Sequence, residues 1–245
     1  MEREDLQGRD VAVDEAKLEA TEVAKTFFRK TRESAQDFYA VRQTTLSLEP
    51  GKVVVLKGRS GSGKSTLLNM MAGLLEPSEG SVVLNGEDLY ALDDAQASRK
   101  RNGSIGVIPQ GHTALHSLTA VQNVTLPYLM YRDDDGIESR ALALLERLGI
   151  RGLADSYPSE LSGGELRRVA VARALVCDPA IILADEPTGD LDDDNTKVVL
   201  ETLRAAANDG AAVLLVTHEQ AAESYADAVL RMDAGVVTRE TPSTS

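Results

Sequence analysis

Four short apolar runs stand out along the chain, and most other segments mix apolar with polar positions. Each run is four to six residues long and contains no charged residue. Uninterrupted apolar stretches of this length are typical of strands covered on both faces, as in the parallel sheets of α/β proteins. The runs occupy residues 53–56, 105–108, 181–184 and 211–216.

Helical patterns alternate with these runs. Apolar residues recur at helical spacing after the first run, and a similar pattern after the third run ends at the turn-forming residues 208–210. Strands that alternate with helices in this way predict a mainly parallel sheet with helices packed on it. The helical pattern after the first run consists of Leu67, Met70, Met71 and Leu74.

Two regions depart from this alternation. Residues 18–48 alternate apolar and polar positions, and residues 81–86 add a further strand and turn, so we expect an N-terminal antiparallel β layer. Between the second and third runs the chain is mostly helical, which predicts an inserted helical subdomain at about residues 111–165. The fold class is therefore α/β, in one domain over residues 17–239. The polar ends, residues 1–16 and 240–245, are expected to be disordered tails.

A phosphate-binding loop directly follows the first apolar run. Residues 58–66, GRSGSGKST, match the pattern G-x-x-x-x-G-K-[ST] between a predicted strand and a predicted helix. The glycines let backbone N–H groups surround phosphates, and the positive end of the following helix points at the same anion. Lys64 would neutralise β- and γ-phosphate oxygens, and Ser65 would ligate Mg²⁺. The candidate nucleotide ligands are Gly58, Arg59, Ser60, Gly61, Ser62, Gly63, Lys64, Ser65 and Thr66. The loop alone is shared by kinases, GTPases and motor ATPases.

Two carboxylates end the third apolar run. Because parallel strands end at the same edge of a sheet, Asp185 would lie beside the phosphate loop, where it could hold Mg²⁺. Glu186 is then the candidate general base that orients and polarises the attacking water. A strand that ends in solvated acids explains the pair equally well when it is considered alone. The phosphate loop elsewhere in the chain favours the catalytic interpretation.

A second glycine-rich segment, LSGGE at residues 161–165, precedes another helical pattern. Ser162, Gly163 and Gly164 would form a second anion site from a hydroxyl, backbone N–H groups and a helix N-terminus. A simple helix cap accounts for the same residues as well, when the segment is taken in isolation.

In their order along the chain, these motifs resemble those of the ATP-binding cassette (ABC) transporter ATPases, over about residues 18–237. The resemblance implies a P-loop NTPase fold with a RecA-like core. It also implies that Gln110, after the second run, contacts Mg²⁺ and water, and that His218, after the fourth, contacts the γ-phosphate. Phe27 matches the aromatic residue that stacks on adenine, with the adjacent Phe28 as the alternative. The implied catalytic residues are Lys64, Gln110, Glu186 and His218.

The resemblance further implies a particular assembly. In the family, the segment corresponding to residues 162–164 closes over the ATP held by another subunit, so two sites form in a head-to-tail homodimer. Residues 189–192 resemble the loop that crosses between the subunits. The second partner would be a transmembrane permease on a separate chain, which docks where residues 111–116 lie. Within the family, residues 117–127, 161–165 and 184–189 look most like the branch of lipoprotein release, macrolide or peptide export and the division-associated ATPase.

Some positions depart from the family pattern. Leu166 and Arg167 stand where glutamines are common, and Asp190 stands where asparagine is usual. Residues 111–116, after Gln110, also differ from the usual sequence. None of these departures removes a catalytic group.

Composition narrows the choice of partners. The 245-residue chain has a formal net charge of −13 and a pI near 4.7, which argues against binding to nucleic acid or to anionic lipid. The longest apolar run, residues 211–216, is much shorter than a membrane helix, and the charged start carries no visible secretory signal. The single Cys177 is expected to serve packing. We therefore expect a peripheral protein on the cytoplasmic face of the plasma membrane.

Three functions fit these expectations to different degrees. The leading hypothesis is an ATP-hydrolysing subunit that powers export or extraction of a lipid-linked, peptide or drug-like substrate through a separate permease. The second is a mechanotransmission ATPase that gates an extracytoplasmic enzyme through a membrane partner. A third hypothesis is action on ribosomes or DNA. It is disfavoured because ribosomal relatives carry two cassettes in tandem and chromosomal relatives carry long coiled coils, and this sequence shows neither pattern.

Overall fold

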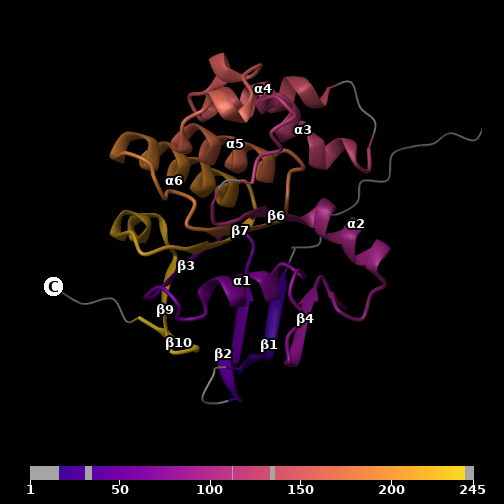
Figure 1. Ribbon diagram of the computed structural model, residues 1–245, viewed down its shortest axis with the longest axis vertical. Helices are drawn as coiled ribbons and strands as arrows, with labels where there is room; N and C mark the ends of the chain where they lie inside the picture. The colour runs from indigo at the N-terminus through magenta and orange to yellow at the C-terminus, as the bar shows by residue number, and fades with distance from the viewer. Residues whose placement is uncertain (1–16, 31–34, 112, 133–135, 241–245) are drawn as a thin grey trace, which may run out of the picture.

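Two sheets and a layer of helices build the protein (Figure 1), as the computed structural model shows for residues 17–30, 35–111, 113–132 and 136–240. The central sheet lies between helices α3 to α5 on one side and the second sheet on the other. The tails that the sequence predicts fall outside the described residues, apart from Glu240, whose backbone N–H donates to the Val229 carbonyl. None of the helices in the described ranges has the length and apolar character needed to cross a membrane.

The central sheet confirms the four predicted strands. Within the described residues it has six strands in the order β10-β9-β3-β8-β7-β6, and the pairs among β9, β3, β8, β7 and β6 are all parallel. The sequence predicted neither β9 nor the edge strand β10, because both are partly or largely exposed and neither has an apolar run as long as those of the four predicted strands. The strands are β3 (Val53–Lys57), β6 (Ile105–Ile108), β7 (Ile181–Asp185), β8 (Ala212–Val216), β9 (Ala228–Asp233) and β10 (Val236–Arg239).

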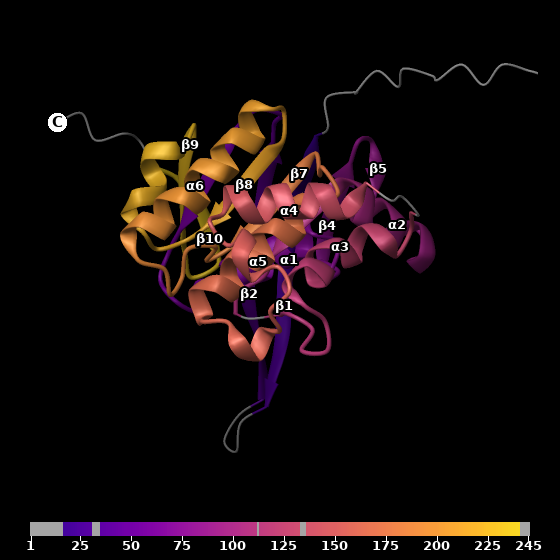
Figure 2. The ribbon, with the colours of Figure 1, turned by 90° about the horizontal axis from the view of Figure 1, so that it is seen from above.

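The second sheet is the predicted antiparallel layer. The described residues place four strands in it, in the order β2-β1-β4-β5. Its long β1–β2 hairpin extends away from the other elements (Figure 2). The strands are β1 (Leu18–Lys30), β2 (Ala35–Leu48), β4 (Glu79–Leu84) and β5 (Glu87–Asp88).

Helix α1 (Lys64–Met71) packs between the two sheets, in one apolar cluster with side chains of both. Its residues Leu67, Met70 and Met71 belong to the predicted helical pattern and are fully buried. The predicted extension of this pattern to Leu74 was wrong, since that side chain is 58% exposed. The helix ends before Gly73, whose φ of 68° turns the chain out of the helix.

The other helices include the inserted subdomain. Helices α3, α4 and α5 lie between β6 and β7 in the chain and pack against one another. The exact limits of the subdomain remain a prediction. Helix α2 was not predicted, because only Ala97 of its residues is buried. The α-helices are α2 (Asp94–Ser104), α3 (Ala120–Leu129), α4 (Ile137–Arg147), α5 (Gly163–Leu175) and α6 (Asp193–Asn208), and the 3₁₀ turns are η1 (Arg151–Leu153), η2 (Pro158–Glu160) and η3 (Gln220–Tyr225).

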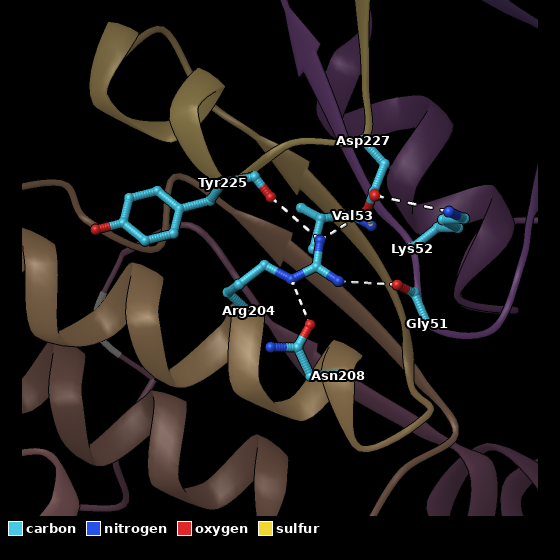
Figure 3. A network of polar contacts seen from close by, with 7 residues as sticks. All are labelled: Gly51, Lys52, Val53, Arg204, Asn208, Tyr225 and Asp227. Carbon is cyan, nitrogen blue, oxygen red and sulfur yellow. Dashed lines mark hydrogen bonds and ion pairs between the residues drawn. The ribbon is translucent and has the colours of Figure 1, made fainter.

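A polar network ties α6 to the starts of β3 and β9 (Figure 3). The Arg204 guanidinium donates to the Asp227 carboxylate at 2.6 Å and to the Gly51 carbonyl at 2.8 Å. The same carboxylate accepts the backbone N–H of Val53 at 2.8 Å. Burial acts to raise the pKa of Asp227, but the Val53 N–H and Arg204 outweigh it, so the pKa is lowered.

Candidate functional site

A cleft of about 1290 Å³ lies where the parallel strands of the central sheet end. The phosphate loop follows β3, Gln110 follows β6, Asp185 ends β7 and His218 follows β8. Parallel strands end at one edge, so the fold brings these distant segments together. The predicted site residues that line the cleft are Phe27, Gly58, Arg59, Ser60, Gly61, Gly63, Lys64, Ser65, Thr66, Gln110, Asp185, Glu186 and His218.

The phosphate loop presents backbone donors and a lysine to this cleft. Helix α1 begins after Gly63, at φ 108°, and no side chain caps its first N–H groups. A β-carbon on Gly63 would come within 2.1 Å of the Ala40 carbonyl oxygen, so the loop requires glycine here. Lys64 is 8% exposed, and its Nζ donates to the Gly58 carbonyl at 2.7 Å. The loop therefore gathers positive electrostatic potential at the start of α1.

The β9–β10 turn is hydrogen-bonded to the loop and was not predicted. Gly235 donates its backbone N–H to the Ser62 carbonyl at 2.9 Å and accepts that of Arg42 at 2.8 Å. Ala234 and Gly235 also line the cleft. The predicted ligand Ser62 does not line it, because its side chain is buried under the loop. A local signal was nevertheless present, because Asp233 and Gly235 flank Ala234 between two short apolar stretches, a pattern typical of a hairpin turn.

Aromatic side chains of β1 and β2 form one wall of the cleft. Phe27 lines it, whereas Phe28 is 67% exposed and does not. The Phe38 ring lies 5.9 Å from that of Phe27, centroid to centroid, and Phe38 pairs with Phe27 across the strands. Phe38 and Tyr39 also line the cleft, although the sequence gave no reason to choose them. The wall offers a flat apolar surface suited to an aromatic base.

Asp185 lies on the floor of the cleft. It is only 5% exposed, and burial raises the pKa of its carboxyl group. A hydrogen bond from Ser65 and the charge of Lys64 oppose that rise. Within the described ranges no group of three or more His, Cys, Asp or Glu residues could hold a metal ion. Asp185, Ser65 and the Gln110 amide nevertheless supply hard oxygen donors, the type that Mg²⁺ prefers together with water and phosphate oxygens.

Glu186 and His218 form a pair beside this floor. Glu186 has a φ of 50°, and its backbone N–H donates to the Val216 carbonyl at 2.8 Å. Its carboxylate accepts from the Thr217 hydroxyl at 3.2 Å and lies 2.9 Å from His218 Nδ1. This hydrogen bond raises the pKa of His218, which favours the cationic imidazole.

Two arginines of α5 hold the loop that carries Gln110. Arg167 Nη1 donates to the Pro109 carbonyl at 3.0 Å, and Arg173 Nη1 donates to the Thr113 carbonyl at 2.9 Å. These contacts lie on either side of Gln110 in the sequence. The position of Gln110 is therefore linked to that of α5.

Ser162 starts α5 and lies outside the cleft, as do Gly163 and Gly164. The Ser162 hydroxyl accepts the Glu165 N–H, and the Glu165 carboxylate accepts the Ser162 N–H at 2.7 Å, forming a capping box. That backbone hydrogen bond lowers the pKa of Glu165. The helix cap considered from sequence is thus present. A nucleotide contact of these residues would have to involve a cleft other than their own.

A phosphate loop between a strand and a helix, with acidic residues ending a neighbouring parallel strand, defines the P-loop nucleoside triphosphatases. Residues 41–189 match the family model described as ABC transporter, and the chain belongs to this family. It is an ATP-binding subunit of an ABC transporter, and its ATPase activity is coupled to transport.

Similar proteins agree with this membership. The lipoprotein-releasing system ATP-binding protein LolD of Pseudomonas syringae pv. tomato is 40% identical over 91% of this chain and 97% of its own length. The protein of that name from Shewanella oneidensis is 43% identical over 78% of this chain and 84% of its own. Among solved structures, a dimeric post-hydrolysis state of the ATP-binding cassette MJ0796 bound to ADP and Pi matches with a TM-score of 0.85 and 33% identity, covering 91% of this chain and 97% of that one.

Proposed function

We propose that two copies of this chain hydrolyse ATP beneath a separate membrane permease, and so drive release of a lipid-linked protein from a membrane. The observation that carries the ATPase chemistry is the single cleft that gathers Lys64, Gln110, Asp185, Glu186 and His218. The similarity to proteins named for lipoprotein release supports the class of substrate. No observation favours the alternative of gating an extracytoplasmic enzyme.

The phosphate loop would bind the triphosphate. The uncapped N–H groups of α1 and the Lys64 ammonium group would neutralise phosphate oxygens, and Phe27 would stack on the adenine. Ser65, Asp185 and Gln110 would hold Mg²⁺, because all three line the cleft with oxygen donors and Ser65 is hydrogen-bonded to Asp185. When bound, the ion would neutralise charge on the phosphates.

Glu186 would act on the attacking water. Its side chain is 15% exposed, and its carboxylate is oriented by Thr217 and His218, so it can accept a proton from water in a defined direction. His218 would lie near the γ-phosphate, where its hydrogen bond to Glu186 raises its pKa and so favours the cationic form. Water attack on the γ-phosphorus would form the new P–O bond as the bond to the β-phosphate oxygen breaks.

The functional unit would be a head-to-tail homodimer. Ser162, Gly163 and Gly164 do not line their own cleft, so in this arrangement they would close over the nucleotide of the other subunit. Dimeric structures of a similar cassette support the assembly, one of them bound to ADP and Pi. Loss of the terminal phosphate between the subunits would then open the dimer.

Mixing two inactive variants tests this assembly. Lys64→Ala lacks the lysine proposed to bind the ATP phosphates. Gly163→Asp places a carboxylate where the phosphate held by the other subunit would bind. Each homodimer should have less than a tenth of the parent turnover, whereas a mixture should recover activity from one intact composite site. Failure to recover activity, in heterodimers verified by differential tags, would contradict the head-to-tail site.

The permease would dock beside the Gln110 loop. Leu115 lies in the segment after Gln110 and is 48% exposed, and Leu129, Met130 and Tyr131, at the C-terminal end of α3, are 42–63% exposed. Exposed apolar side chains of this size are common at protein contacts. The chain would accordingly lie on the cytoplasmic face of the membrane and contact it through protein, in keeping with its net charge of −13.

Copurification tests the partner and substrate. Tagged chain extracted from membranes in detergent with ATP should retain a multispanning protein. In vesicles, that complex should release a lipid-anchored protein only with ATP. The Lys64→Ala complex is the matched control and should release none. ATP hydrolysis without release of any lipid-linked protein would contradict the proposed substrate and leave the ATPase assignment standing.

A further inference from the structure

Arg167 places a buried positive charge in the wall of the nucleotide cleft. It lies near the start of α5, is 3% exposed and lines the cleft together with Lys64 and Gln110. One guanidinium nitrogen, Nη1, donates to the Pro109 carbonyl. The buried Nε has no hydrogen-bond partner in the described parts of the chain. Nη2 lies 3.9 Å from the position that a β-carbon on Gly189 would occupy.

This guanidinium lacks a close carboxylate. Within residues 17–240, leaving out the undescribed segments, no acidic oxygen lies within the 4.0 Å of an ion pair with it. Asp190, Asp185 and Glu186 act on it only as more distant charges, and burial lowers its pKa. A buried cation without an ion-paired partner costs free energy. An anion bound in the cleft would remove that cost.

The place of Arg167 indicates which anion this would be. The phosphate loop and the start of α1 line the cleft, and Arg167 reaches it from α5, bonded to the residue before Gln110 and close enough to Asp185 and Glu186 to interact with their charges. Groups at this place face the phosphate end of a triphosphate rather than its adenosine end, if the loop holds the phosphates and Phe27 the base. Guanidinium groups match phosphate oxygens through paired N–H donors.

We propose that Arg167 binds the terminal phosphate of ATP and thereby makes the cleft distinguish ATP from ADP. The inference rests on the proposed use of this cleft as the ATP site. Because Arg167 lies on α5 and holds the loop of Gln110, its phosphate contact would also link the start of that helix to the presence of the γ-phosphate.

Equilibrium binding to the full chain tests the inference. Arg167→Gln keeps a donor for the Pro109 carbonyl and removes the charge, while Arg167→Lys keeps the charge. Affinity is measured for Mg²⁺ with the imido analogue of ATP, which is not hydrolysed, and for Mg²⁺–ADP. Arg167→Gln should weaken analogue binding roughly tenfold or more and change ADP binding less than threefold. Arg167→Lys should retain most of the preference for the analogue.

Arg168→Gln is the matched control on the same helix. Arg168 donates to Asn195 at 2.7 Å and does not line the cleft, so its replacement should change neither affinity more than twofold. Equal weakening of both nucleotides by Arg167→Gln, or a large fall in its unfolding temperature without nucleotide, would overturn the inference in favour of a structural role. A parent chain that binds neither nucleotide would instead contradict the proposed function.

Discussion

Two arginines, at opposite ends of the parallel strands of the central sheet, differ in how many partners their guanidinium groups have. Arg204 lies where the strands begin and is partly buried, and Arg167 lies where they end and is almost fully buried. Arg204 contacts the Asp227 carboxylate, the Gly51 and Tyr225 carbonyls and the Asn208 side chain (Figure 3). Arg167, at the edge of the cleft, has one carbonyl partner and a buried Nε without any in the described residues.

This difference in partners indicates that one end of the sheet contributes to stability and the other to binding and catalysis. Where β3 and β9 begin, the Arg204 guanidinium and the Asp227 carboxylate bind each other and nearby backbone groups, so both contribute to folding. At the edge where the strands end, positive and acidic groups lie around a cleft and are only partly matched to one another. Unmatched groups at such a position indicate that a ligand completes them.

The largest effect expected from this contrast is on turnover. Glu186→Gln removes the base but keeps the side-chain shape, so ATP hydrolysis should fall at least about 100-fold while ATP binding is retained. The unfolding temperature should change by only a few degrees. Phosphate release, nucleotide binding and thermal unfolding measure the three quantities. Unchanged turnover would remove Glu186 from the proposed mechanism.

A change at Arg204, where the strands begin, should instead lower stability and leave turnover unchanged. Arg204→Met keeps the apolar stem but removes the donors to Asp227 and Gly51, which should lower the free energy of unfolding by about 2 kcal/mol. Lys197→Met on the same helix is the control. Its exposed pair with Glu201, at 3.8 Å, contributes about 0.5 kcal/mol or less. Turnover per folded molecule should be unaltered in both, as denaturant titrations and ATPase assays would establish.

Lowering the pH should reduce the contribution of the Arg204–Asp227 ion pair to the free energy of unfolding. The folded-state pKa of Asp227 is lowered, so its contribution is fully present above the unfolded-state value, about 4, and is lost as pH falls through the folded value. Asp227→Asn should therefore be less stable than the parent at pH 7, and this deficit should shrink below about pH 4. Denaturant midpoints across that range give the comparison. A deficit independent of pH would show that the charge of Asp227 does not contribute.

The sequence predicted elements wherever burial is complete along a segment. The strands β3, β6, β7 and β8 are buried on both faces, so a run of apolar letters was sufficient to identify them. Strand β9 and the edge strand β10 are partly or largely exposed without a regular period, and α2 is polar on almost every face. These three elements are stabilised by residues distant in the sequence, and a local sequence pattern carries no information on such contacts.

The same limit applied to the site. Lys64, Asp185 and Glu186 could be identified because each stands at a fixed place in a strand-loop-helix motif. Arg167 was visible only as a departure from a family pattern. Its burial and its position in the cleft follow from how α5 packs against the loop after β6, which no local signal specifies.

The smallest effect concerns two helices that begin with the same local device. Thr119 and Gln122 form a capping box at α3, as Ser162 and Glu165 do at α5. Thr119→Ala and Ser162→Ala should each lower the free energy of unfolding by about 1 kcal/mol, because each removes a comparable cap.

Only one of these two caps has a proposed second role, which is to contact the nucleotide of the other subunit. Ser162→Ala should therefore also lower the ATPase rate of the dimer, by about tenfold if one hydrogen bond to phosphate is lost, whereas Thr119→Ala should not. Chemical unfolding and turnover measured on both variants separate the roles. If Ser162→Ala matched Thr119→Ala in turnover as well as stability, the hydroxyl of Ser162 would be a helix cap and nothing more, and the composite site would rest on the backbone of Gly163 and Gly164.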